Sequence, residues 1–114
     1  MQEKRRLKRR HLLYNLIVIN AETGETLGRL ADINVEGLLI VSQNPVPFPA
    51  DYDLRITLPQ KILGQEVLQV AAKSLWAGKD VNPSLILTGF QLKKPSAREI
   101  EAIVGLIFSY GAPE

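Results

Sequence analysis

Residues 26–42, TLGRLADINVEGLLIVS, consist of two β-rich runs on either side of a short polar connection. The first run predicts a strand over about Thr26–Ile33, and the second predicts a strand that begins beyond Gly37. Between them, DINVEG brings together Asp, Asn and Gly, which favour turns for local reasons. Strands joined by so short a connection are expected to lie side by side in an antiparallel sheet.

The β pattern continues on both sides of this stretch. Residues 14–20, YNLIVIN, are apolar on both faces and predict an earlier strand, followed by a turn around Gly24. After the central stretch, residues 43–50, QNPVPFPA, contain three prolines. Because proline donates no hydrogen bond to a β-ladder, this segment is expected to be a connecting loop.

Alternating apolar and polar residues predict three more strands. The first covers Tyr52–Leu58, and Pro59 is expected to end it. The second is centred on the apolar positions between Leu68 and Trp76, and the third covers residues 84–92, SLILTGFQL. Six strands with short connections predict a mainly β fold, either a small antiparallel barrel or a sandwich.

The last segment, residues 96–111, SAREIEAIVGLIFSYG, has the period of a helix. Ser96 and Glu99 match a capping box at its start, and Gly111 suits its end. An apolar stripe at helical spacing, expected to face the strands, contains Ile100, Ile103, Val104 and Ile107. Three residues off this stripe form a second apolar surface, a candidate for homodimer formation or partner docking: Leu106, Phe108 and Tyr110.

The composition fits one soluble domain of 114 residues, with 46% hydrophobic residues and no cysteine. The lack of cysteine excludes disulfides and thiol nucleophiles, and the single histidine, His11, has no second histidine or cysteine to complete a metal site. No nucleophile and base set is recognisable, so we expect neither an enzyme nor a cofactor.

The apolar run Leu12–Ile19 is too short and too polar for a signal sequence, and no run of about 20 apolar residues predicts a membrane span. A cytoplasmic protein is therefore expected.

Positive charge is concentrated in residues 3–11, EKRRLKRRH. The first eleven residues carry six Lys or Arg and one Glu, a net charge of +5, whereas the remainder carries eight basic and eleven acidic residues, a net charge of −3. Such a segment is expected to be mobile unless an anion gathers it. Each guanidinium offers a planar fork of donors that fits phosphate or the acceptor edge of guanine. The segment alone is equally compatible with a solvated basic terminus.

Two motifs together resemble the PilZ domain family. RRLKRR is followed, 22 residues after Arg10, by DINVEG, and later by a tryptophan-containing strand and TGFQL. The family signature is an RxxxR arm and a D/N-x-S-x-x-G turn on a six-stranded antiparallel β-barrel with helical additions. The resemblance covers about Arg5–Phe90 and implies binding of cyclic di-GMP (c-di-GMP). It divides the chain into an arm (1–11), a barrel (12–94) and a C-terminal α-helix (95–111).

The resemblance assigns nucleotide-binding roles to the arginines of the arm. Arg6 and Arg10 match the RxxxR pair, with Arg5 before them, but Arg5 and Arg9 have the same spacing and leave the register open. All four are candidates to hold guanine and phosphate groups. An arginine just before RxxxR implies that two nucleotides are bound per chain.

The resemblance also assigns roles to the turn. Asp32 matches the acidic position, where it can accept from purine donor groups, and Gly37 matches the glycine, which permits a turn or close backbone approach. Asn34 departs from the family pattern, because serine is expected there; its amide can both donate and accept but is bulkier. Glu36 places a second carboxylate near the expected phosphates.

The expected function is a cytoplasmic c-di-GMP receptor or adaptor whose arm orders around the ligand and signals to a downstream protein. One alternative is a PilZ-like interaction scaffold that no longer binds the nucleotide. Another is a small nucleic-acid-binding barrel, disfavoured because the barrel is net acidic and lacks interleaved exposed aromatics. Trp76 is interpreted as core or barrel-rim packing, or, if exposed near the site, as a stacking surface for a base.

Overall fold

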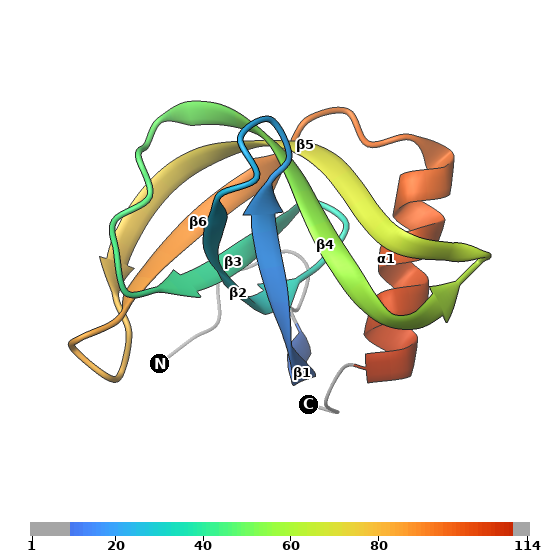
Figure 1. Cartoon of the computed structure of the whole chain (residues 1–114), viewed down its shortest axis with the longest axis horizontal. Coiled ribbons are helices and arrows are strands. Elements are labelled where there is room, and N and C mark those ends of the chain that lie inside the picture. The colour runs from blue at the N-terminus through green and yellow to red at the C-terminus, as the bar shows by residue number, and fades with distance from the viewer. Residues whose placement is uncertain (1–9, 111–114) are drawn as a thin grey trace.

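The computed structural model describes residues 10–110, and the side chains of residues 16–109 (Figure 1). Its six strands are β1 (Arg10–Asn20), β2 (Thr26–Ile33), β3 (Gly37–Ser42), β4 (Ala50–Ile62), β5 (Gln65–Lys79) and β6 (Ile86–Leu92). They close into an antiparallel barrel in the order β1-β2-β3-β6-β5-β4, and helix α1 (Ala97–Tyr110) follows. The predicted fold class, a six-stranded antiparallel β-barrel with a C-terminal helix, is confirmed.

The barrel interior is filled by the inward-facing residues of all six strands. The side chains buried there include Leu16, Val18, Leu30, Ile33, Leu38, Ile40, Leu54, Ile56, Leu68, Val70, Ala72 and Phe90. Burial at alternate positions is what the period of a strand requires when one face is packed and the other faces solvent. The alternation used to locate the strands therefore reflects their packing.

The prediction that Pro59 ends its strand is wrong. Strand β4 continues through Pro59 to Ile62, and β5 begins at Gln65. The regular β4–β5 pairing is interrupted, however, between the pairs Thr57–Val67 and Ile62–Gln65. Because Pro59 falls inside this irregular stretch, its missing N–H donor interrupts the ladder without ending the strand.

Helix α1 completes the core where β1 and β4 are not paired. These two strands pair only between Val18–Asn20 and Leu54–Ile56. Three α1 side chains join the same core cluster as Leu58 and Ile62 of β4: Ala102, Ile103 and Leu106. The predicted capping box is present, since the Ser96 N–H donates to Glu99 Oε1 and the Glu99 N–H donates to Ser96 Oγ, both at 3.1 Å.

The predicted orientation of α1 is only partly correct. Ile103 is buried, but Val104 is 51% exposed, whereas Leu106, expected on an outer surface, is fully buried. The reason is close packing on the side of Gly105, where an added Cβ would lie 2.7 Å from Ile62 Cγ2. Small residues let the barrel approach this side of the helix, an effect that a pattern of apolar residues does not reveal. Of the proposed outer surface, Phe108 is 91% exposed and the Tyr110 side chain lies outside the described residues.

The proline-rich β3–β4 connection is a loop, as predicted, and side-chain hydroxyls hold it. Pro47 O accepts hydrogen bonds from Ser74 Oγ at 2.8 Å and from Tyr52 Oη at 3.2 Å. Ser74 Oγ also accepts a hydrogen bond from the Ala50 N–H at 3.0 Å. A single buried hydroxyl of β5 thus satisfies backbone groups on both sides of Pro49.

We expect Ser74→Ala to lower the free energy of unfolding by about 1 kcal/mol or more, because it removes the fully buried hydroxyl that bonds both Pro47 O and the Ala50 N–H. Thr88 provides a matched control, since its hydroxyl is also fully buried but has no hydrogen-bond partner among the described residues. Thr88→Val should be neutral or stabilising. Urea denaturation of both variants measures the difference, and equal losses of stability would contradict this account of Ser74.

Within residues 10–110, no helix combines the length and apolar character needed to cross a membrane.

Candidate functional site

The β2–β3 turn is organised by the side chain of Asn34. Asn34 Oδ1 accepts hydrogen bonds from the N–H groups of Glu36 and Gly37, at 2.8 and 3.0 Å, and the Asn34 N–H donates to Gly37 O at 2.9 Å. The Asn34 side chain is therefore buried, with 7% of the residue exposed. Its carbonyl replaces backbone partners inside the turn, which is the usual role of Asn in such turns.

Asp32 lies in β2 between β1 and β3. Its Cα is paired with that of His11 on one side and with that of Leu39 on the other, and the residue is only 4% exposed. The neighbouring pair joins Arg10 to Ile33. The backbone of Arg10, at the start of β1, thus lies beside the Asp32 end of β2. Arg5, Arg6 and Arg9 lie outside the described residues.

A row of cross-strand neighbours continues from Asp32 around the outside of the barrel. Asp32 is paired with Leu39 of β3, Leu39 with Gly89 of β6, and Gly89 with Trp76 of β5. Trp76 is 44% exposed, so of its interpretations only that of a core residue is wrong, whereas barrel-rim packing and base stacking stay predictions. Its ring covers Gly89, where an added Cβ would lie 2.2 Å from Trp76 Nε1. An aromatic face therefore lies on the same outer surface as the row of paired residues that leads to Asp32.

Comparison with known proteins identifies the family to which this barrel and its β2–β3 turn belong. A protein-family model described as the PilZ domain matches residues 3–109. The chain belongs to the PilZ domain family. A search of curated proteins finds no significant match.

Two solved structures resemble this PilZ domain in fold. The inhibitor of motility MotI/DgrA of Bacillus subtilis has a TM-score of 0.71 at 14% identity, covering 95% of this chain and 52% of its own. PlzA of Borreliella burgdorferi, solved in complex with c-di-GMP, has a TM-score of 0.58 at 16% identity, covering 91% of this chain and 51% of its own. The chain thus spans about half the length of each.

A second row on the outer surface of the PilZ domain begins at Gly37. Gly37 is paired with Gln91 of β6, and Gln91 with Lys73 of β5. Both side chains are exposed, and Lys73 forms no ion pair with the residues that the structure describes. The sequence did not predict Lys73 or Gln91 as site residues, because only the register of β3, β6 and β5 shows that they lie on the surface next to the turn.

The PilZ turn also explains two departures noted in the sequence. Because Asn34 Oδ1 is bonded within the turn, the extra bulk of this residue is largely buried. Glu36 is exposed, and its carbonyl oxygen accepts a hydrogen bond from the Leu92 N–H at 2.9 Å. Among the side chains of residues 16–109, no three His, Cys, Asp or Glu are grouped to hold a metal ion.

Proposed function

We propose that this PilZ domain is a cytoplasmic receptor module for c-di-GMP. The ligand would lie on the outer barrel surface at the β2–β3 turn. Four arginines of the arm would hold it (Arg5, Arg6, Arg9 and Arg10), together with Asp32, Asn34 and Gly37 of the turn. The observation that carries the proposal is the pairing of Arg10 and His11 with Ile33 and Asp32, because it joins the base of the arm to the turn.

Binding is proposed to order the arm. Without an anion, the six positive charges of the first eleven residues repel one another. Charged hydrogen bonds contribute roughly 1.5–3 kcal/mol each, whereas ordering a segment costs roughly 2–5 kcal/mol or more. Two or three well-placed arginines are therefore enough to offset the cost of ordering the arm, and the loss of one should weaken binding measurably. The ordered arm would then present a new surface to a downstream protein.

The turn contributes polar groups and the barrel an aromatic face. The side-chain Nδ2 group of Asn34 forms no hydrogen bond with the described residues, so it can donate to the ligand in place of the family's serine hydroxyl. Lys73, one row from Trp76, adds positive charge on the same surface. Trp76 supplies a face on which a guanine base can stack.

Trp76→Ala should weaken c-di-GMP binding by about fivefold, which corresponds to about 1 kcal/mol of stacking. Trp76→Phe should keep most of the affinity, because it retains an aromatic face. The change is measured by calorimetric titration, and quenching of Trp76 fluorescence by the ligand gives a second readout, since this is the sole tryptophan of the chain. Unchanged affinity in Trp76→Ala would exclude stacking at this position.

Calorimetric titration of the whole chain with c-di-GMP tests the proposed function. We expect exothermic binding of one or two nucleotides per chain that weakens as salt is added, because charged contacts between ligand and arm are screened. No heat of binding, at any salt concentration, would overturn the proposal and favour a protein-interaction scaffold.

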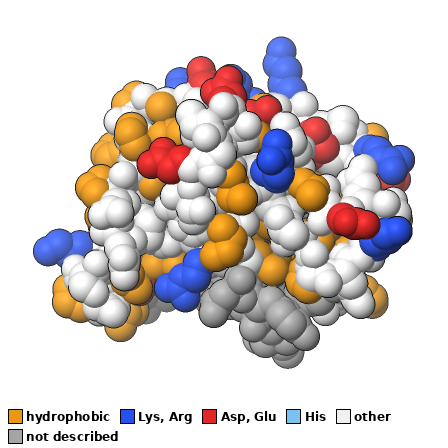
Figure 2. All heavy atoms as spheres, viewed as in Figure 1, with side chains coloured by type: hydrophobic (Ala, Val, Ile, Leu, Met, Phe, Trp, Pro, Cys, Tyr) orange, Lys and Arg blue, Asp and Glu red, His pale blue; other side chains and the backbone are white. Residues whose placement is uncertain are grey.

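Titration with a labelled single-stranded nucleic acid distinguishes a c-di-GMP receptor from the remaining alternative, a small nucleic-acid-binding barrel. The face shown in Figure 2 carries Lys and Arg side chains interspersed with Asp and Glu, without a continuous basic surface. Nucleic-acid binding requires such a surface, so this face gives it no support.

A further inference from the structure

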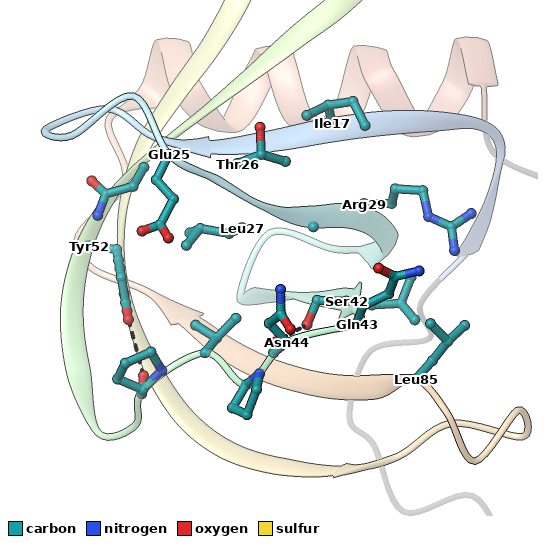
Figure 3. A pocket seen from close by; sticks show the side chains of 16 residues that line it. Ile17, Glu25, Thr26, Leu27, Arg29, Ser42, Gln43, Asn44, Tyr52 and Leu85 are labelled. Atoms are coloured by element: carbon teal, nitrogen blue, oxygen red, sulfur yellow. Dashed lines mark hydrogen bonds between the residues drawn. The ribbon is translucent and has the colours of Figure 1, made fainter.

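A pocket of about 530 Å³ lies at the end of β2 farthest from Asp32 (Figure 3). It is bordered by Glu25, Leu27 and Arg29 on one side and by the β3–β4 connection on the other. Ligand pockets typically have volumes of roughly 300–1,000 Å³, so this one is large enough to bind a molecule. None of the residues proposed to bind c-di-GMP lines it.

The β2 side of the pocket has opposite charges at its two ends. Glu25, immediately before β2, and Leu27 and Arg29 within β2 all line the pocket, although a bulge at Leu27 interrupts the regular pairing of β2 with β1. Four residue steps at the rise of a strand place the backbones of Glu25 and Arg29 at most about 13 Å apart, and the bulge shortens this distance. Figure 3 shows their side chains on opposite sides of Leu27. Neither forms an ion pair with the residues that the structure describes.

The Glu25 carboxylate acts electrostatically on Tyr52, which also lines the pocket. The pKa of Tyr52 is raised, first by burial and second by the negative charge of Glu25. The Tyr52 hydroxyl donates to Pro47 O, so Tyr52 and the loop form a fixed wall. The carboxylate therefore faces the pocket with no described cation to balance it.

The loop side of the pocket offers groups that suit a peptide backbone. Gln43 and Asn44 are exposed, and their side-chain amides form no hydrogen bond with the described residues. Each amide carries both a donor and an acceptor, the same pair that a peptide group presents. Between these amides and the charges of β2, Leu27 and Val46 provide an apolar floor.

We propose that this pocket binds an extended segment of a partner protein that has a basic residue, an apolar residue two positions away and an acidic residue four positions away. Alternate side chains of an extended segment point to the same side, so three of them can reach the three residues that line this wall of the pocket. The basic residue would meet Glu25, the apolar residue Leu27, and the acidic residue Arg29. Either chain direction satisfies this pattern.

The charges of the pocket favour such a segment over other ligands. A small anion would pair with Arg29 but leave Glu25 unbalanced. A nucleic acid would bring phosphates toward the Glu25 carboxylate, which is unfavourable. An extended segment with both charges balances the two ends together, and the Gln43 and Asn44 amides can bond to its backbone.

Selection from a library of short random peptides displayed on phage tests the proposal. Against the wild-type chain, we expect enrichment of peptides with a basic, an apolar and an acidic residue at alternate positions. A selected peptide should bind Arg29→Glu about tenfold more weakly, because a charged contact is replaced by repulsion. When the library is selected for binding to Arg29→Glu instead, the enriched peptides should carry a basic residue in place of the acidic one.

Arg98→Glu, on the exposed start of α1, makes the same change of charge away from the pocket and should leave peptide binding unchanged. Glu25→Lys is a second test, because it should select an acidic residue at the other end. Circular dichroism checks that each variant is folded. Failure to enrich any such pattern, or equal binding to wild type and Arg29→Glu, would overturn the proposal. Titration of Arg29→Glu with c-di-GMP should give the wild-type affinity, so the two proposed sites are tested separately.

Discussion

Arg10→Ala is expected to weaken c-di-GMP binding by roughly tenfold or more. Its backbone is paired with Ile33, next to Asp32, so among the arginines of the arm it is the one whose attachment to the β2–β3 turn is described. Loss of one charged hydrogen bond, at roughly 1.5–3 kcal/mol, corresponds to at least one decade in the dissociation constant. Calorimetric titration measures the change, and wild-type affinity in Arg10→Ala would contradict this role.

Two further variants make the Arg10 experiment specific. Arg98→Ala removes the same charge from the exposed start of α1 and should leave the affinity unchanged. Arg10→Lys keeps the charge but loses the planar fork, so an intermediate affinity is expected if the contact is bidentate. Comparison with Arg9→Ala determines the register: a larger loss in Arg10→Ala assigns the RxxxR pair to Arg6 and Arg10.

The positions of the strands could be predicted because each depends on local chemistry. β-rich runs located β2 and β3, alternation located β6, and the reciprocal pair of Ser96 and Glu99 located the start of α1. Pro59 shows the limit of such rules. Its missing N–H ends a strand only where the neighbouring strand would accept a hydrogen bond from that position. The irregular pairing of β4 with β5 around Pro59 means that no such donor is required there. The inner face of α1 likewise depends on how closely Ile62 approaches Gly105, which is a tertiary contact.

The candidate site was predictable where its residues are close in sequence. Asp32, Asn34 and Gly37 belong to one turn, and their proximity follows from their spacing. The row from Asp32 to Trp76 depends instead on the order β2-β3-β6-β5, in which β3 neighbours a strand 44 residues later in the chain. No local pattern specifies which strands become neighbours. The sequence therefore could not predict that Lys73 and Gln91 lie near the turn, or that a pocket lies beside Arg29.

Gly37→Ala is expected to lower the free energy of unfolding by about 3 kcal/mol, the upper part of the range for overpacking. A Cβ at Gly37 would lie 2.3 Å from Phe90 O, a backbone atom of the neighbouring strand, which cannot rotate away. Strands β3 and β6 would have to separate at the pair Gly37–Gln91, next to the turn. For a domain of about 100 residues, the midpoint of thermal unfolding should fall by about 15 °C.

Gly78→Ala is the matched control, because it adds the same methyl group to a strand but meets only the Trp76 ring, at ordinary distances of 3.6 and 4.0 Å. It should leave stability unchanged or slightly raised, since glycine is unfavourable within strands. The comparison also separates two roles for the motif glycine. If Gly37 serves mainly to admit the ligand, Gly37→Ala will unfold like the wild-type chain and lose only c-di-GMP binding. If glycine is required because Phe90 O lies so close, Gly37→Ala will lose stability even without ligand. Binding will then fail as well, because the turn that holds Asn34 is displaced.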